Sequence, residues 1–118
     1  MRVLVILLCF GLLSSCATSS KSDYSQTGLA SWYGERFHGR KTASGEIYNM
    51  HALTAAHPKL PFGTKLLVTS KTTGKSVEVR VNDRGPFARK RNIDLSYAAA
   101  KQIGIVQMGE DEVEISRP

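Results

Sequence analysis

The residues best suited to chemistry lie in the stretch 81–96. This stretch holds two carboxylates, Asp83 and Asp94, between an alternating strand and an alanine-rich segment. Gly85 and Pro86 predict a turn directly after Asp83, because glycine tolerates unusual φ angles and proline fixes φ. An acid held rigidly at the end of a strand, among arginines, is suited to proton transfer. An Asp–Arg ion pair that holds a loop explains the same residues, and this stretch alone favours that simpler interpretation.

Two further titratable side chains, Glu46 and His57, have ordinary explanations when each is taken by itself. Glu46 is then a solvated turn residue, and His57 a partly buried, hydrogen-bonded histidine. A zinc hydrolase would have to use His38, His51 and His57, whose spacing matches no zinc motif, so we predict no metal site.

The N-terminal residues 1–15 predict a secretory signal peptide. Arg2 is followed by an almost wholly apolar run that is too short to span a membrane, which takes about 20 residues. The run ends in Leu-Ser-Ser-Cys, which resembles a bacterial lipobox and would make Cys16 the lipidated N-terminus, with palmitate among its acyl chains. Ala17 in place of Asp resembles an outer-membrane sorting signal. We therefore expect a lipid-anchored protein of the bacterial cell envelope, on the outer membrane facing the periplasm; a plain signal cut near Ala17 is the alternative.

The organisation predicted after the signal peptide is simple. Residues 16–27 are rich in Ser and Thr and predict a lipidated tether, and residues 28–118 predict a single domain. Both cysteines, Cys9 and Cys16, precede that domain. We therefore expect a core without disulfides, without a cysteine nucleophile and without a cofactor.

The net charge of +6 favours an anionic partner, and a soluble surface with surplus lysine is the ordinary alternative. In an exported chain, peptidoglycan or an anionic membrane surface is a better candidate than nucleic acid. The basic cluster 89–91 is too small to argue otherwise.

The elements that must position these residues are mostly short strands. Alternating apolar and polar residues predict a hairpin with one buried face over 64–82, turning at 71–74. Other extended pieces are expected at 28–33, 46–48, 93–95 and 111–116. Ser96 can cap a helix over 97–103 that Gly104 ends. Short strands without βαβ repetition favour a small β-barrel.

Six short motifs occur in one order along the predicted domain. They are Ala-Ser-Trp-Tyr-Gly at 30–34, Thr-Ala-Ser-Gly-Glu at 42–46, Leu-Thr-Ala-Ala-His at 53–57, Leu-Pro-Phe-Gly-Thr at 60–64, Val-Arg-Val-Asn-Asp-Arg-Gly-Pro-Phe at 79–87 and Ile-Asp-Leu-Ser at 93–96. Together they resemble the rare lipoprotein A family, the septal-ring lytic transglycosylases, over essentially all of 28–118.

The resemblance implies a mainly β fold, a small six-stranded double-psi β-barrel with one or two short helices. It also implies endolytic cleavage of peptidoglycan glycan strands, preferentially those lacking stem peptides, to give 1,6-anhydromuramic ends. The C6 hydroxyl of the sugar is then the nucleophile, so one well-placed carboxylic acid suffices. Cell-division proteins or amidases are possible partners of such an enzyme.

Site residues are carried over from the matching motifs. The resemblance implies Asp83 as the general acid and base, with Glu46 and His57 as further catalytic residues that orient the sugar or tune Asp83. The substrate-binding residues it implies are Asp94, Arg84, Asn49, Trp32 and Tyr33. Asp94 is equally explained as a helix cap, and the two aromatic residues as core or rim. The alternative function is a non-catalytic, expansin-like peptidoglycan-binding lipoprotein.

Overall fold

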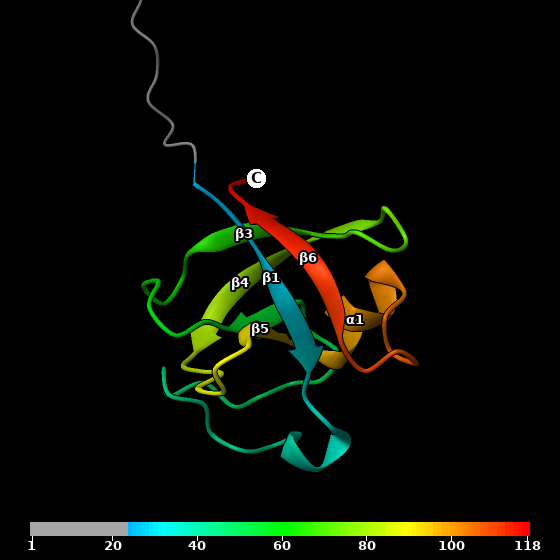
Figure 1. Cartoon of the computed structure of the whole chain (residues 1–118). Coiled ribbons are helices and arrows are strands. Elements are labelled where there is room, and N and C mark those ends of the chain that lie inside the picture. The colour runs from blue at the N-terminus through cyan, green and yellow to red at the C-terminus, as the bar shows by residue number, and fades with distance from the viewer. Residues whose placement is uncertain (1–23) are drawn as a thin grey trace, which may run out of the picture.

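A computed structural model describes residues 24–118, which form a closed β-barrel with strand order β1-β5-β2-β4-β3-β6 (Figure 1). The predicted mainly β fold, a six-stranded barrel with a short helix, is confirmed. The signal peptide, Cys16 and most of the tether lie outside the described residues. The elements are β1 Ser25–Trp32, a 3-10 turn Glu35–Phe37, β2 Thr54–Ala56, β3 Lys65–Ser70, β4 Ser76–Asp83, β5 Arg91–Leu95, α1 Tyr97–Ile103 and β6 Asp111–Ser116.

Branched apolar side chains fill the barrel. Along β4, Val77, Val79 and Val81 are buried, whereas the intervening residues face outward. Val113 and Ile115 do the same on β6. This period of two is the alternation that predicted the hairpin and the closing strand, and it confirms that one face of each strand forms the core.

The pairing of strands brings polar residues from distant parts of the chain into one row. β2 runs parallel to β4 with Ala56 opposite Asp83, and antiparallel to β5 with Ala56 opposite Asp94. β1 runs parallel to β5 with Ser31 opposite Asp94. Neighbouring strands are about 4.8 Å apart, so the row Asp83, Ala56, Asp94, Ser31 crosses four adjacent strands within about 15 Å. The row lies at the end of the barrel opposite the C-terminus (Figure 1).

Helix α1 begins and ends where the sequence predicts. The hydroxyl of Ser96 accepts a hydrogen bond from the Ala99 backbone N–H, which satisfies one of the donors left free at a helix start. Gly104, with φ of 79°, ends the helix in the left-handed conformation that glycine adopts at little cost. Ala99, Ala100 and Ile103 pack into the core. No helix within residues 24–118 is long and apolar enough to cross a membrane.

Two predicted segments differ from the structure. β1 begins at Ser25 and not at Gly28, because residues 25–27 pair with the last strand, β6. Those three residues therefore belong to the barrel and not to the tether, and their polar character concealed a strand whose partner lies at the far end of the chain. The extended piece expected at 46–48 is a single bridge between Lys41 and Ile47.

Candidate active site

Asp83, the last residue of β4, is the carboxylate in this row that accepts the most hydrogen bonds. Its Oδ1 atom accepts hydrogen bonds from the backbone N–H of Ala43 at 2.8 Å and of Arg84 at 2.9 Å. Its Oδ2 atom accepts one hydrogen bond, from the Tyr33 hydroxyl at 2.7 Å. Oδ1 is thus occupied by two fixed donors, and Oδ2 is the oxygen with room to bind a proton and pass it on.

Tyr33 is held in place by its aromatic neighbours. Its ring centroid lies 4.8 Å from that of Tyr48 and 5.8 Å from that of Phe37. Burial, the hydrogen bond to Asp83 and the charges of Asp83 and Asp94 together raise the pKa of Tyr33, so its hydroxyl stays protonated and donates. The resemblance implied that Tyr33 binds sugar; the structure places its hydroxyl on the candidate catalytic acid.

Asp94 faces the same end of the barrel. Its Oδ1 accepts a hydrogen bond from Ser31 Oγ at 2.5 Å and lies 3.5 Å from Arg91 Nη1, which also donates to Ser31 Oγ at 2.7 Å. The helix-cap interpretation of Asp94 is wrong, because Ser96 caps α1. Ser31 and Arg91 were not expected at the site. The register of β1 with β5 brings Ser31 to Asp94, whereas Arg91 precedes Asp94 by three residues on β5 itself.

Glu46 forms an ion pair across the surface of β4. Both of its oxygens accept from the Arg80 guanidinium, at 2.6 and 3.0 Å, and Oε1 also accepts from Asn82 Nδ2 at 3.2 Å. The hydrogen bonds from Arg80 and then from Asn82 lower the pKa of Glu46, so it is ionised at neutral pH. Glu46 therefore pins the turn 42–46, whose Ala43 N–H binds Asp83, to the end of β4.

Sequence reasoning missed both partners of Glu46. Arg80 and Asn82 were assigned only to the outward face of the predicted strand. The available signal was that these two polar residues immediately precede Asp83 on one strand, where they can hold a neighbouring loop.

His57 is buried and its ring orientation is set by backbone groups. Nδ1 accepts from the backbone N–H of Lys59 at 3.0 Å and of Leu60 at 3.1 Å. Burial, followed by the charges of Arg84 and Lys59, lowers the pKa of His57, which favours the neutral ring. Because Nδ1 accepts, the hydrogen of the neutral ring is on Nε2. Nε2 lies 3.5 Å from the Tyr24 hydroxyl. The link to Asp83 is through the backbone, where His57 N–H donates to the Asp83 carbonyl at 3.1 Å.

Arg84 braces the loop after β2. Its Nη1 donates to the carbonyl oxygens of Leu60 at 2.8 Å and of His57 at 3.3 Å, and its guanidinium lies 4.2 Å from the ring centroid of Phe62. Within residues 24–118 it forms no ion pair with an acid. Its side chain therefore shapes the surface beside Asp83 without neutralising it.

Trp32 and Asn49 do not converge on Asp83. Trp32 Nε1 donates to the Val106 carbonyl at 3.3 Å. Its ring packs edge-on against the ring of Tyr97, with 5.5 Å between the ring centroids. Trp32 therefore packs on the side of the barrel that carries α1. The Asn49 side chain accepts from the backbone N–H of His51 at 2.9 Å, which forms a local turn.

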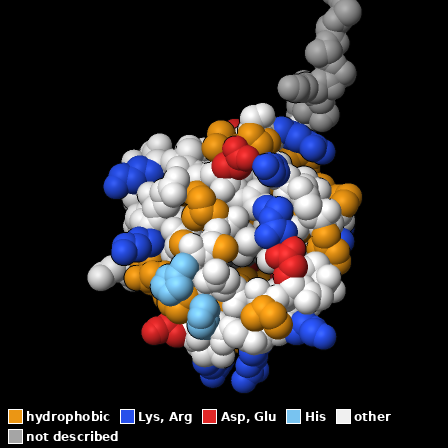
Figure 2. Space-filling model, turned by 180° about the vertical axis from the view of Figure 1, so that it is seen from behind, with side chains coloured by type: hydrophobic (Ala, Val, Ile, Leu, Met, Phe, Trp, Pro, Cys, Tyr) orange, Lys and Arg blue, Asp and Glu red, His pale blue; other side chains and the backbone are white. Residues whose placement is uncertain are grey.

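The three histidines of the sequence do not gather at one point. The ring centroids of His38 and His51 are 5.8 Å apart. Histidine side chains are visible on the molecular surface in Figure 2. His57 is buried at the end of β2. In the part of the chain that the structure describes, no three side chains of His, Cys, Asp or Glu are grouped as metal ligands would be.

Solved structures with this fold come from proteins of different kinds. The Streptomyces papain inhibitor matches with a TM-score of 0.63 and 21% identity, over 80% of this chain and 96% of its own. The Clavibacter michiganensis expansin matches with a TM-score of 0.61 and 19% identity, over 80% of this chain and 51% of its own. At such identities the likeness concerns the fold.

Sequence relatives are closer. The endolytic peptidoglycan transglycosylase RlpA of Neisseria meningitidis is 55% identical over 96 residues, which are 81% of this chain and 40% of that protein. RlpA of Vibrio cholerae is also 55% identical, over 92 residues, 78% of this chain and 35% of that protein. The chain thus spans well under half the length of these relatives. The model of the lytic transglycolase family matches residues 25–115. These residues run from the start of β1 to the residue before the end of β6. The chain therefore belongs to this family of double-psi β-barrels, the RlpA family.

Proposed function

We propose that this domain is an endolytic peptidoglycan transglycosylase whose general acid and base is Asp83. The observation that carries the proposal is the unequal coordination of its two carboxylate oxygens, with two backbone donors on Oδ1 and one hydroxyl on Oδ2. Membership of the family and relatives named as peptidoglycan transglycosylases support the substrate class.

The reaction uses one carboxyl group, which first donates a proton and then accepts one. Protonated Oδ2 of Asp83 gives its proton to the glycosidic oxygen as the bond from that oxygen to C1 of the muramyl residue breaks. The C6 hydroxyl oxygen of the same residue bonds to C1, and its proton returns to Oδ2. No water is consumed, and the product is a 1,6-anhydro end. Asp94 lies on β5, opposite Ala56, and its negative charge stabilises the positive charge that develops at C1.

Other residues act through Asp83. Tyr33 fixes the direction of its carboxylate, and the ion pair of Glu46 with Arg80 holds the turn that donates to Oδ1. An ionised Glu46 is unsuited to donating a proton, so its contribution is positional. Arg84 holds the loop after β2 beside Asp83 through its hydrogen bonds to the Leu60 and His57 carbonyl oxygens.

The test is cleavage by a soluble fragment 24–118, which contains every strand of the closed barrel. Intact sacculi and sacculi stripped of stem peptides by an amidase are incubated with the fragment, and the products are analysed by mass spectrometry. We expect anhydromuramic ends, mainly from stripped strands, and none from Asp83→Asn, which keeps its fold by circular dichroism. Reducing ends would instead indicate a hydrolase. Pelleting with sacculi without products would support the expansin-like binding module.

We also propose that the protein is a lipoprotein anchored through Cys16 to the outer membrane. The apolar run that ends in Leu-Ser-Ser-Cys, and the Ala that follows it, support this proposal. Cys16→Ala should abolish palmitate labelling and release the protein from the membrane fraction. An amidase that removes stem peptides is the partner class that would supply the substrate.

A further inference from the structure

A cavity of about 460 Å³ lies between the start of β1 and the loop that follows β2. Gln26 lines it from β1 and Tyr24 from just before that strand, His57 and Lys59 line it from the loop, and Asn92 from β5. None of the roles assigned to Asp83, Glu46 or Asp94 uses this cavity. Its position is nevertheless close to the catalytic strand end, because the His57 backbone N–H donates to the Asp83 carbonyl.

The best-defined donor in the cavity is Nε2 of His57. Because Nδ1 is occupied by two backbone N–H groups, the neutral ring must carry its hydrogen on Nε2. The side chain is only 5% exposed, and the nearest partner of Nε2 is the Tyr24 hydroxyl at a long 3.5 Å. That hydroxyl itself donates to Gln26 Oε1 at 2.7 Å. A buried donor with one distant partner costs free energy that a ligand acceptor can recover.

Two amides add donors to the same space. Asn92 Oδ1 accepts from the Leu29 backbone N–H at 3.1 Å, which leaves Nδ2 as the donor that the side chain can offer. The oxygen of Gln26 is likewise taken by Tyr24, which leaves its Nε2. The two amide oxygens therefore already have partners, and the two NH2 groups add N–H donors to the lining.

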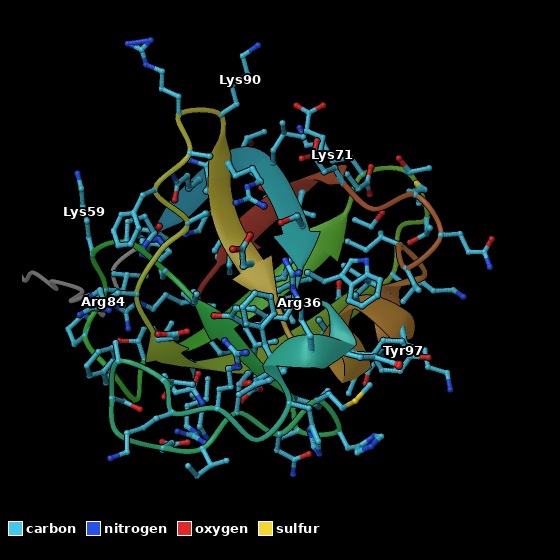
Figure 3. All side chains as sticks on the ribbon, turned by 90° about the horizontal axis from the view of Figure 1, so that it is seen from below. Arg36, Lys59, Lys71, Arg84, Lys90 and Tyr97 are labelled. Atoms are coloured by element: carbon cyan, nitrogen blue, oxygen red, sulfur yellow. The ribbon has the colours of Figure 1, made fainter. Side chains whose placement is uncertain are left out.

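Positive charge surrounds the cavity. Lys59 lines it, and the charges of Arg84 and Lys59 are felt at His57, where they help to lower its pKa. Burial raises the pKa of Tyr24, and the positive charge of Arg117 opposes that rise. Figure 3 shows Lys59 and Arg84 on the same side of the molecule. Among residues 24–118, no acidic residue lines the cavity; Glu114 accepts a hydrogen bond from the lining residue Ser25 at 3.5 Å.

We infer that this cavity is a carboxylate-binding subsite, in which His57 Nε2–H, Lys59 and the amide of Asn92 hold a carboxylate of the substrate. N–H donors and a lysine ammonium suit a carboxylate. The identity of the ligand rests on the proposed function, since peptidoglycan offers two carboxylate sources. One is the lactyl group of muramic acid, which is free only on strands without stem peptides, and the other is the stem peptide itself. His57 is then a binding residue next to the reacting sugar.

The test is ligand binding followed through the His57 ring by NMR. The sequence has three histidines, so the His38 and His51 rings are internal references. The probes are N-acetylmuramic acid, N-acetylglucosamine without the lactyl carboxylate, N-acetylmuramyl-L-alanine amide with that carboxylate blocked, and a stem tripeptide. We expect N-acetylmuramic acid to shift the His57 signals and the two carboxylate-free sugars to leave them unchanged. Shifts by the tripeptide and not by N-acetylmuramic acid would also support the subsite and assign it to the peptide. Shifts by neither acid would overturn it.

Lys59→Gln provides the second measurement. Loss of the Lys59 charge should weaken the binding of N-acetylmuramic acid about fivefold, which corresponds to the free energy of one exposed ion pair. Lys71→Gln, an exposed lysine in the turn between β3 and β4 and well separated from Lys59 in Figure 3, is the matched control and should bind like the unmodified domain. Equal affinity in all three proteins would contradict the subsite.

Cleavage assays separate this subsite from the proposed function. Anhydromuramic products without any carboxylate effect on His57 would remove the subsite and keep the transglycosylase. A carboxylate-dependent shift of His57 without products would keep the subsite and remove the transglycosylase.

Discussion

The chemistry of a single carboxylate depends on how each of its oxygens is held. At Asp83 two backbone donors fix Oδ1, while Oδ2 meets only a side-chain hydroxyl. Backbone donors cannot rotate away, so they define the plane of the carboxylate. The Tyr33 hydroxyl can follow Oδ2 as that atom gains or loses a proton. The arrangement orients Oδ2 for proton transfer without occupying both of its lone pairs.

Tyr33→Phe tests this role at the scale of one atom. The variant keeps the ring packing on Tyr48 and loses a hydrogen bond to a half-buried acid, so the free energy of unfolding should fall by about 1–2 kcal/mol. The kcat on stripped glycan should fall about tenfold with little change in KM, because Tyr33 positions the acid and does not bind substrate. Urea unfolding and initial rates measure the two effects.

Tyr97→Phe is the control for that variant, since its ring packs on Trp32 away from Asp83. It should leave kcat unchanged. A Tyr33→Phe enzyme with full kcat would exclude the hydroxyl from the mechanism.

Elements, and not only residues, are needed to assemble the site. The turn 42–46 is attached to β4 by Glu46, which bridges Arg80 and Asn82, and by the Ser44 N–H, which donates to the Asn82 carbonyl at 3.3 Å. This attachment brings the Ala43 N–H to Asp83. The turn is thus part of the catalytic machinery although its own side chains do not touch the reacting atoms.

Glu46→Gln and Arg80→Gln should therefore have similar effects. The ion pair is about 40% exposed on each side, so either change should cost less than about 1 kcal/mol of unfolding free energy. Each should lower kcat about tenfold by loosening the turn. The double variant should be no worse than either single one, because both act through one contact. If the losses of kcat in the two single variants add up in the double variant, Glu46 acts separately from Arg80.

Helix α1 depends on a buried cap. Besides accepting from Ala99, the Ser96 hydroxyl donates to the Ala52 carbonyl at 2.6 Å, so it joins the helix start to the segment before β2. Ser96→Ala should lower the free energy of unfolding by about 2–3 kcal/mol, from the lost cap and the unpaired buried carbonyl. Ser76→Ala, at an exposed strand position, should change it by less than about 0.5 kcal/mol. Chemical denaturation of both variants measures the difference.

At the scale of the whole molecule, closure of the barrel decides which residues meet. β1 reaches β5 and β6 at once, and Gly28 permits the close approach to β5, since a Cβ there would lie 1.9 Å from Asn92 Oδ1. The same contact lets Asn92 accept from the Leu29 N–H and line the cavity beside His57. Barrel closure and the proposed subsite therefore share residues.

The buried His57 should make the stability of the fold pH-dependent. Burial and the charges of Arg84 and Lys59 lower its pKa in the folded state below the usual 6.5, so the unfolded chain binds a proton more readily. The stabilising contribution is complete above pH 6.5 and is lost as the pH falls from there through the folded pKa. The free energy of unfolding, measured with urea, should thus be lower at about pH 5.5 than at about pH 7.5. His57→Gln should reduce this difference, and an unchanged difference would assign it to other groups.

Local sequence determined a large part of this protein. The alternation of 75–82 and 111–116 predicted two strands, Ser96 and Gly104 predicted the helix bounds, and the motif around Asp83 predicted the acid at a strand end; all three are as the structure has them. Each rests on neighbours a few residues apart, whose backbone preferences and side-chain periodicity are visible in the chain itself.

Tertiary structure alone decided what these residues contact. Tyr33 is 50 residues from Asp83, Ser31 is 63 from Asp94, and Glu46 is 34 from Arg80. These pairs meet because β1, β4, β5 and the turn 42–46 come together in a closed barrel, in parallel and antiparallel registers that local pattern does not specify. The same closure turned polar residues 25–27 into strand and left Ser96, not Asp94, to cap the helix. Strand order and register depend on the packing of the whole core, so only the folded barrel fixes the geometry of the site.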